Sequence, residues 1–289
     1  MRLRLIRNPI IIKIAFLVFF CVMPMLASDG SLAVLQYPVS IRSAGMGQYF
    51  EPNNTPTSIY HLTDRRAEVS FWQWIGGVNG LALTVNRLPI AVTVNYLSIN
   101  DIEYRTEVPS ELSQFNFGYS NAAIGLTSGR TLGKFHTAMT VQYLWEKTLD
   151  YSARGIDISL SGDFDLTNSL YVTAGFRHAG FISALDQQSS HLPFAVFGQA
   201  AFHRNNLGVT GELTTGDFPV KLSGEYTFMS MIHLYGGIQV SQNVNGTGTQ
   251  FYPSTGFEID WQTFTLGYAM YQLNHPVNSH QYASIAWRF

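Results

Sequence analysis

Few side chains in this sequence have the types and spacing that a catalytic, metal-binding or phosphate-binding site needs. Gly118-Tyr119-Ser120-Asn121-Ala122 comes close to the Gly-x-Ser-x-Gly turn that presents a nucleophilic serine, but it ends in Ala and follows a strand pattern rather than a strand-to-helix turn. The eight histidines include no i, i+4 pair and no zinc-ligand spacing. No glycine-rich phosphate loop precedes a helix. We therefore expect no enzymatic activity, no metal and no cofactor.

Charged side chains form a second set with chemical potential. They lie on the polar face of segments in which every second residue is apolar, and they carry both signs: Glu146, Asp157, Asp163, Arg177, Glu212, Lys221, Glu225 and Glu258. Mixed signs on neighbouring strands predict ion pairs across an enclosed lumen or to a segment inside it. For each residue a structural role is the stronger expectation, because a buried charge must be paired whether or not anything passes through the lumen.

The segments that position these charges have a period of two. In the clearest example an apolar row alternates with a small or polar one: Phe264, Leu266, Tyr268 and Met270 against Thr263, Thr265, Gly267 and Ala269. Counting such segments predicts fourteen strands, at 68–75, 78–86, 90–97, 115–127, 134–146, 154–165, 169–178, 192–202, 207–214, 219–228, 232–241, 251–259, 262–272 and 281–289. Their lengths match the roughly 9–11 residues that a tilted strand needs to cross a membrane.

The connections and the aromatic residues indicate the same architecture. If the chain enters from the periplasm, long outward loops are expected at 98–114, 147–153, 179–191 and 242–250, and tight periplasmic turns at 87–89, 166–168, 203–206 and 229–231. Seven aromatic residues fall at strand ends on the periplasmic side, where their rings favour the headgroup layer: Phe135, Phe164, Phe202, Phe228, Trp261, Phe264 and Trp287. The fold class is therefore an all-β transmembrane antiparallel barrel of about 14 strands, spanning 67–289.

Composition separates this fold from the alternatives. Charged residues make up 12% of the 289 residues, against about 25% in an ordinary soluble domain, and aromatic residues reach 14%. A mean hydropathy of +0.06 is too low for a bundle of membrane-spanning helices. A secreted all-β binding domain with a sandwich fold would also alternate, but its polar face should carry Lys and Glu. Here that face is mainly Thr, Ser, Gly and Asn, which favours the barrel.

The first residues are typical of a secretory signal peptide, which we place at 1–27. Four basic residues precede an apolar run from Ile14 to Met23, and Ala27 and Ser28 follow it. The single cysteine, Cys21, lies in that run, so a mature chain would have no thiol for disulfides, catalysis or zinc binding. Without the leader, 13 Lys and Arg remain against 19 Asp and Glu, a net charge of −6 that argues against a nucleic-acid partner.

Residues 28–66 do not alternate, contain Pro38 and Pro56 among their prolines, and end in Asp64-Arg65-Arg66. Such a segment fits best inside the lumen as an N-terminal plug, with a flexible periplasmic tail as the alternative. Within it, Pro38 is followed by Arg42 and then by Gly45-Met46-Gly47. In this order of residues the segment resembles the start of the PorV/PorQ family, which are FadL-like outer-membrane barrels. The resemblance implies a role in protein export or surface attachment of the Bacteroidetes type IX kind, with secretion-system proteins as partners.

The last strand carries a further resemblance. Its outward row ends in an aromatic residue, with Ala283, Ile285, Trp287 and Phe289 on one face, and it resembles the terminal signal by which the barrel assembly machinery recognises its substrates. This implies the bacterial outer membrane as location and its lipid as surroundings. The alternative function is a FadL-like channel that takes up a hydrophobic solute and releases it through a lateral gap. The segment 121–125 and the Gly236-Gly237 pair are where we expect a strand to bend for such a gap.

Overall fold

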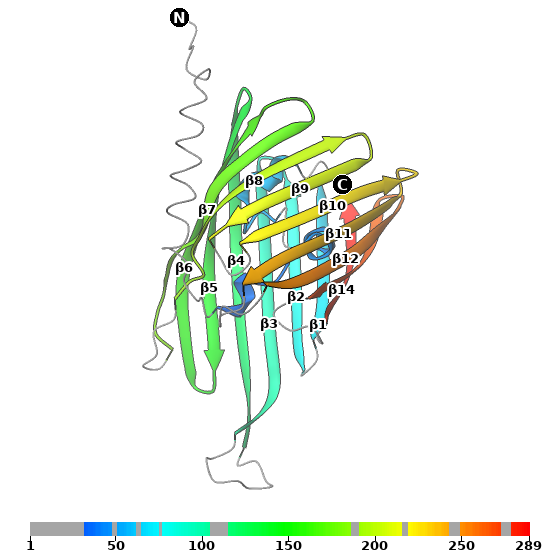
Figure 1. Ribbon diagram of the computed structural model, residues 1–289. Helices are drawn as coiled ribbons and strands as arrows, with labels where there is room; N and C mark the ends of the chain where they lie inside the picture. Colours follow the sequence, from blue (N-terminus) through cyan, green and yellow to red (C-terminus); the bar gives the residue numbers. More distant parts are fainter. Residues whose placement is uncertain are drawn as a thin grey trace, which may run out of the picture.

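Fourteen antiparallel strands form a closed barrel in which each strand pairs with its neighbours in the sequence and β1 pairs with β14 (Figure 1). The structure is a computed structural model, and it describes residues 32–47, 51–61, 65–74, 77–104, 115–185, 191–215, 219–242, 249–272 and 279–289. The predicted fold class is confirmed. The signal peptide predicted at 1–27 lies outside the described residues.

The strands differ in length round the barrel. Those from β3 to β7 have 13–18 residues, whereas the remaining ones have 8–13. Their bounds are β1 Arg66–Trp74, β2 Val78–Arg87, β3 Ile90–Tyr104, β4 Phe115–Leu132, β5 Phe135–Thr148, β6 Tyr151–Asp165, β7 Leu170–Ile182, β8 Ala195–Arg204, β9 Leu207–Thr214, β10 Val220–Phe228, β11 Ile232–Gln242, β12 Thr249–Trp261, β13 Phe264–Gln272 and β14 Ser279–Arg288. All fourteen predicted segments therefore correspond to strands.

The apolar rows face outward and the polar rows face the lumen. On β13, Leu266 is 53% exposed whereas its neighbour Thr265 is 2% exposed. On β6, Ile156 and Ile158 are exposed on either side of the fully buried Asp157. The described strands form one closed sheet with an apolar outer surface. The alternative of a sandwich is therefore wrong, because the apolar rows of a sandwich would meet in a dry core.

The two ends of the barrel differ. At the end where β1 begins and β14 ends, called here the terminal end, the connections are short, and all seven aromatic residues predicted to lie there are exposed. At the opposite end, called the loop end, most connections are longer. Two expected loops are wrong in extent. β5 and β6 are joined by Leu149-Asp150 alone instead of by 147–153, because their pairing continues past the apolar band to Thr148 and Tyr151. The polar residues before that turn belong to a strand. The loop expected at 98–114 begins only after Tyr104, where β3 ends.

Bulges interrupt the sheet at places other than those expected. The segment 121–125 and the Gly236-Gly237 pair are in regular register with both neighbouring strands, so the expectation that strands bend there is wrong. The register shifts instead at Asn100-Asp101 of β3 and at Arg177-His178 of β7, with φ values of +57° for Asp101 and +59° for His178. In each case two residues face one on the partner strand, which is the geometry of a β-bulge.

The described residues of the N-terminal region, 32–47 and 51–61, lie inside the ring of strands and are called here the inner segment (Figure 1). It contains the short helices η2 Ala33–Leu35, α2 Ile41–Gly45 and η3 Pro56–Tyr60. Most of its side chains are buried. Among the described residues, no helix is long and apolar enough to cross a membrane.

Candidate functional site

The site that the fold builds is the barrel lumen, where the inner segment meets the wall. Arg42 on α2 donates two hydrogen bonds of 2.9 Å to the carboxylate of Glu225 on β10. Ser40 caps the start of this helix: its hydroxyl accepts a hydrogen bond of 3.2 Å from the backbone N–H of Ser43. The predicted motif residue and one predicted lumen charge therefore form a bidentate ion pair, which is the strongest kind of charged contact that an arginine makes.

Close packing and backbone conformation explain why the motif has glycines at positions 45 and 47. A Cβ on Gly45 would lie 2.8 Å from Cβ of Tyr235 and 3.2 Å from the backbone of Gly256, so only glycine lets α2 lie this close to β11 and β12. Its carbonyl accepts a hydrogen bond of 3.0 Å from the hydroxyl of Ser254. Gly47 has a φ of +74°, in the left-handed region that favours glycine. Met46 between them is fully buried in the apolar cluster of this wall.

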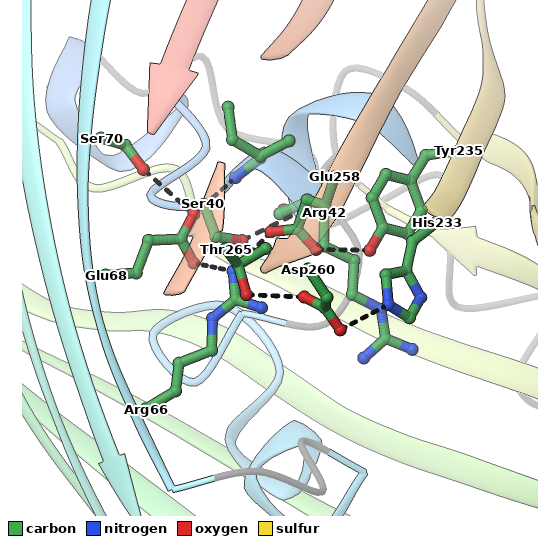
Figure 2. A network of polar contacts seen from close by, with 12 residues as sticks. Ser40, Arg42, Arg66, Glu68, Ser70, His233, Tyr235, Glu258, Asp260 and Thr265 are labelled. Carbon is green, nitrogen blue, oxygen red and sulfur yellow. Dashed lines mark hydrogen bonds and ion pairs between the residues drawn. The ribbon is translucent and has the colours of Figure 1, made fainter. Parts of the chain in front are cut away.

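A second charged network lies beside α2 and is drawn in Figure 2. Arg66, the first residue of β1, donates hydrogen bonds of 2.6 Å to Glu68 and 2.5 Å to Glu258. Glu258 also accepts a hydrogen bond of 2.5 Å from the hydroxyl of Tyr235, and Glu68 accepts one of 3.1 Å from the backbone N–H of Ile41. The wall charges thus hold the start of α2 through a backbone group as well as through Arg42.

The segment around η3 is attached to β6. Asp163 accepts a hydrogen bond of 2.6 Å from the hydroxyl of Thr57, and its other oxygen lies 2.6 Å from Nε2 of His61. The backbone N–H of Thr57 donates to the hydroxyl of Ser161 at 2.9 Å. The His61 ring stacks on Tyr171 of β7, with 3.8 Å between ring centroids. Together with the Arg42–Glu225 pair, these contacts attach the inner segment to β6, β7 and β10.

The turn between these two attachments is held by a buried carboxyl group. Glu51 accepts hydrogen bonds from the backbone N–H of Val39 at 2.5 Å and from the side chain of Asn54 at 3.3 Å. Burial raises the pKa of Glu51 to about 8, because a charged form without water is unfavourable. The carbonyl of Pro52 accepts hydrogen bonds from the hydroxyls of Thr127 and Thr140 on the wall.

The remaining predicted lumen charges pair within the wall. Lys221 and Arg177 both contact Glu212, at 3.3 Å and 2.9 Å. Asp157 is buried, lies 3.0 Å from His178 and accepts a hydrogen bond of 2.6 Å from Gln142. Glu146 is also buried and accepts a hydrogen bond of 2.7 Å from the hydroxyl of Tyr119. All eight predicted charges thus point into the lumen, and two of them, Asp163 and Glu225, touch the inner segment.

Several residues of the site were missed in the sequence. Glu68 is on the inward row of β1 and the alternation could have identified it, because it directly precedes the outward-facing Val69 in a regular strand. Arg66 was assigned to the plug, although β1 begins with it. Glu51, Thr57 and His61 lie in a region without periodicity, and nothing in their spacing indicates what they contact.

A polar cavity of about 250 Å³ lies between the inner segment and the terminal end of the barrel. Its lining is formed by the charged groups described above together with polar side chains at strand ends: Val39, Ser40, Arg42, Pro52, His61, Arg66, Glu68, Thr84, Asn86, His203, Glu225, Thr227, His233, Tyr235, Glu258, Asp260 and Thr265. Figure 2 shows Asp260, one of these lining residues, bonded to His233 and Thr265. A cavity of this kind suits water and polar groups rather than a hydrocarbon.

The opposite half of the lumen contains an apolar niche. Leu32, Val34 and Leu35 of the inner segment are buried there against residues of four strands and the loop that follows them: Ala123, Leu144, Ala153, Ile182 and Leu192. Ile182 lies in the last part of β7, beyond its bulge. The pairing of β7 with β8 ends at Arg177 and Ala195, so among the described residues this part of β7 is paired on one side only. The niche therefore borders the part of β7 that has no β8 partner among the described residues.

The predicted assembly signal occupies the outer face of β14. Ile285, Trp287 and Phe289 are 47%, 51% and 49% exposed, and Ala283 lies in the same outward row. The rings of Trp287 and Phe289 are 5.4 Å apart. Recognition by an assembly machinery stays a prediction.

Solved structures of other proteins share this architecture. No protein-family profile and no curated sequence matches the chain. Among solved structures, the toluene transporter TbuX of Ralstonia pickettii matches with a TM-score of 0.57 and 10% identity, over 86% of this chain and 98% of the transporter. The toluene transporter TodX of Pseudomonas putida matches with 0.55 and 11%, over 91% and 98%, and the monoaromatic hydrocarbon channel CymD with 0.54 and 10%, over 87% and 97%. The chain has the fold of these FadL-like barrels.

Proposed function

We propose that this protein is an outer-membrane channel that takes up hydrophobic small molecules in the manner of FadL-like barrels. The observation that carries the proposal is the fold, shared over 98% of TbuX and of TodX, both toluene transporters. The alternative function inferred from the sequence thereby becomes the main one. The inner segment is then a plug, the terminal end faces the periplasm, and residues 1–27 are removed as a signal peptide.

The proposed location follows from the outer surface of the barrel. The rows of exposed apolar residues on β6, β13 and β14, bounded at the terminal end by exposed aromatic residues, suit lipid tails and headgroups. We expect the protein to fractionate with outer membranes and to migrate faster on SDS gels when it has not been heated. Recovery as a soluble periplasmic protein would contradict this location.

The apolar niche is the proposed place where the solute enters the wall. A hydrophobic molecule that displaces Leu32, Val34 and Leu35 would exchange one apolar contact for another at little cost. It would then lie beside the part of β7 that lacks a β8 partner, where lateral release into the bilayer requires no passage through the polar cavity. This route keeps a hydrocarbon away from the charged half of the lumen.

Uptake measurements test the proposal. Cells expressing the protein, in a strain without its own channel for hydrophobic compounds, should take up radiolabelled toluene or a fatty acid faster than control cells, with no gain for a sugar. Leu144→Gln makes the niche polar and should reduce this uptake. Leu97→Gln, an equally buried leucine in another cluster, is the matched control and should leave it unchanged. Equal uptake with and without the protein would reject the function.

The export role implied by the motif Arg42 to Gly47 stays a prediction. Its test is the secreted proteome of a strain in which the gene is deleted. An unchanged secreted proteome together with lost uptake would favour the channel, and the reverse result would favour export.

A further inference from the structure

Four aromatic side chains from three neighbouring strands line the lumen towards the loop end. Trp72 of β1 lies opposite Tyr282 of β14, and Tyr271 of β13 lies opposite His280 of β14. All four are buried, and each is within three positions of the loop end of its strand. These four residues are called here the aromatic box. The box therefore lies in the loop-end half of the lumen.

The position of the Trp72 ring depends on a glycine of the next strand. Gly80 of β2 pairs with Trp72 in the register of the sheet. A Cβ on Gly80 would overlap the indole of Trp72, so only glycine lets the ring lie against this part of β2. The backbone of β2 thereby supports the ring from the wall side.

A ring of the inner segment occupies the box. Tyr37 stacks on the indole of Trp72, with 4.5 Å between ring centroids and 15° between ring planes. Its ring also lies 5.1 Å from that of His280, at a tilt of 54°. Stacked and tilted contacts of this kind are the arrangements that aromatic rings prefer. The box therefore accommodates a planar ring with a polar substituent.

The backbone of Tyr37 is held separately from its side chain. The amide of Asn95 on β3 donates hydrogen bonds to the carbonyls of Val34 and Tyr37, at 2.9 Å and 3.3 Å. These bonds do not involve the phenol, so a change of side-chain rotamer moves the ring without breaking them. A solute with the shape of the ring can then take its place while the inner segment stays attached to the wall.

Two hydrogen-bond donors of the box have no acceptor among the residues that the structure describes. They are the indole N–H of Trp72 and the hydroxyl of Tyr282, on side chains that are 3% and 0% exposed. By contrast, the hydroxyl of Tyr271 accepts a hydrogen bond of 3.0 Å from Gln239. An unpaired donor is unfavourable when it is buried, and an indole N–H can only donate. The two donors therefore favour a ligand that supplies an acceptor.

We propose that the aromatic box binds planar aromatic solutes that carry a hydrogen-bond acceptor, with the solute ring in the place of the Tyr37 ring. The acceptor oxygen has two lone pairs and accepts from Trp72 and Tyr282, which are cross-strand neighbours. The proposal rests on the proposed function and names the solute class that the channel selects. Solutes without the oxygen still reach the apolar niche, so the box adds a preference and is not required for transport.

The binding of three probes tests the proposal. Acetophenone has a ring and an acceptor, ethylbenzene has the ring alone, and cyclohexyl methyl ketone has the acceptor alone. Each radiolabelled probe is equilibrated with the full-length barrel in lipid nanodiscs, and binding to empty nanodiscs is subtracted. We expect acetophenone to bind more tightly than either of the other probes by about fivefold, the effect of a hydrogen bond or of a ring contact.

Variants that remove one group at a time test the residues of the box. Trp72→Phe and Tyr282→Phe each keep a ring but remove a donor, so both should reduce the advantage of acetophenone over ethylbenzene. Tyr271→Phe is the matched control, because it removes a hydroxyl that is already bonded to Gln239, and it should leave the advantage unchanged. Tyr37→Ala vacates the box and should tighten acetophenone binding about fivefold, whereas Tyr37→Phe keeps the competing ring and should not.

Three outcomes would overturn the proposal. One is equal affinity for acetophenone and ethylbenzene, a comparison that needs no variant, and another is an advantage that Trp72→Phe and Tyr282→Phe leave intact. The third is tighter binding of tetramethylammonium than of acetophenone, which would identify the box as a cation site. Binding of both aromatic probes without preference contradicts only the box, whereas binding of neither contradicts the proposed channel as well.

Discussion

Glu225 on β10 accepts two hydrogen bonds of 2.9 Å from the guanidinium of Arg42, a residue 183 positions earlier in the sequence. Glu225 also lies 3.1 Å from Nδ1 of His203 on β8. The ion pair thus joins the inner segment to two strands at once. Because both of its side chains are 16% exposed, it is shielded from bulk water on most sides.

Breaking this ion pair should loosen the inner segment. Arg42→Gln leaves the Glu225 carboxylate without its main partner, and we expect a loss of about 2 kcal/mol in the attachment of the segment. Faster cleavage of the segment by an added protease, and a higher conductance in planar bilayers, would report the change. The double variant Arg42→Gln, Glu225→Gln removes both charges and should be milder than Arg42→Gln alone. A double variant that is worse than either single variant would contradict the pairing.

Two consecutive glycines on β11 should differ in their tolerance of the same substitution to alanine. A Cβ on Gly237 would lie 2.7 Å from the backbone of Met46, whereas one on Gly236 would have no heavy atom within 4 Å. Gly237→Ala should therefore push the inner segment away from the wall, and Gly236→Ala should be silent. Protease sensitivity of the inner segment measures both, with barrel folding checked by gel mobility without heating. Equal effects would mean that the segment does not pass this close to β11.

The facing of β13 predicts a contrast between neighbouring residues. Leu266→Arg places a charge in the apolar band and should cost about 2–4 kcal/mol of unfolding free energy near the midplane. Thr265→Arg places it in the lumen, beside Asp260, and should cost less. Reversible unfolding in lipid vesicles gives both values. The assignment fails if the two variants are equally unstable.

The pKa of Glu51 predicts a pH dependence of the inner segment. The carboxyl has an ordinary pKa of 4.5 when exposed and about 8 when buried in the folded protein, so the folded state favours the proton. The stability that this group contributes is complete below about pH 4.5 and is lost as the pH rises through about 8.

Protease cleavage of the inner segment should therefore accelerate between pH 5 and pH 9, after correction for the activity of the protease itself. Glu51→Gln keeps an oxygen that can accept from Val39 but cannot ionise, and it should flatten this profile. A profile that is equally steep in Glu51→Gln would assign the pH dependence to another group.

The barrel was predictable because its signal is local. Each strand has its own two-residue alternation, and the facing of Leu266 or Asp157 needs no knowledge of distant residues. The ends of the strands were harder to predict, because β5 and β6 continue beyond the apolar band, where polar residues are equally compatible with a loop. The bulges at Asp101 and His178 have no glycine to indicate them.

The lumen contacts were only partly predictable, for the opposite reason. The alternation places Glu225 inside the barrel, and the order of residues around Arg42 singles out that arginine. Nothing in the sequence pairs the two, because the contact depends on how the inner segment crosses the closed barrel. The Gly236-Gly237 pair was predicted to bend the strand, whereas the missing side chain of Gly237 makes room for Met46. Glycines in a strand have both uses, and only the packing distinguishes them.

The long separation of the contacting residues sets an order of events during biogenesis. Gly45 meets Ser254 across 209 residues, and Arg66 meets Glu258 across 192. The β12 residues that bind the N-terminal region are therefore translated long after that region. Until β12 is added and the seam between β1 and β14 closes, Gly45 and Arg66 have no Ser254 or Glu258 to bind. Docking of the N-terminal region is thus a late step that checks whether the cylinder has closed in the right register.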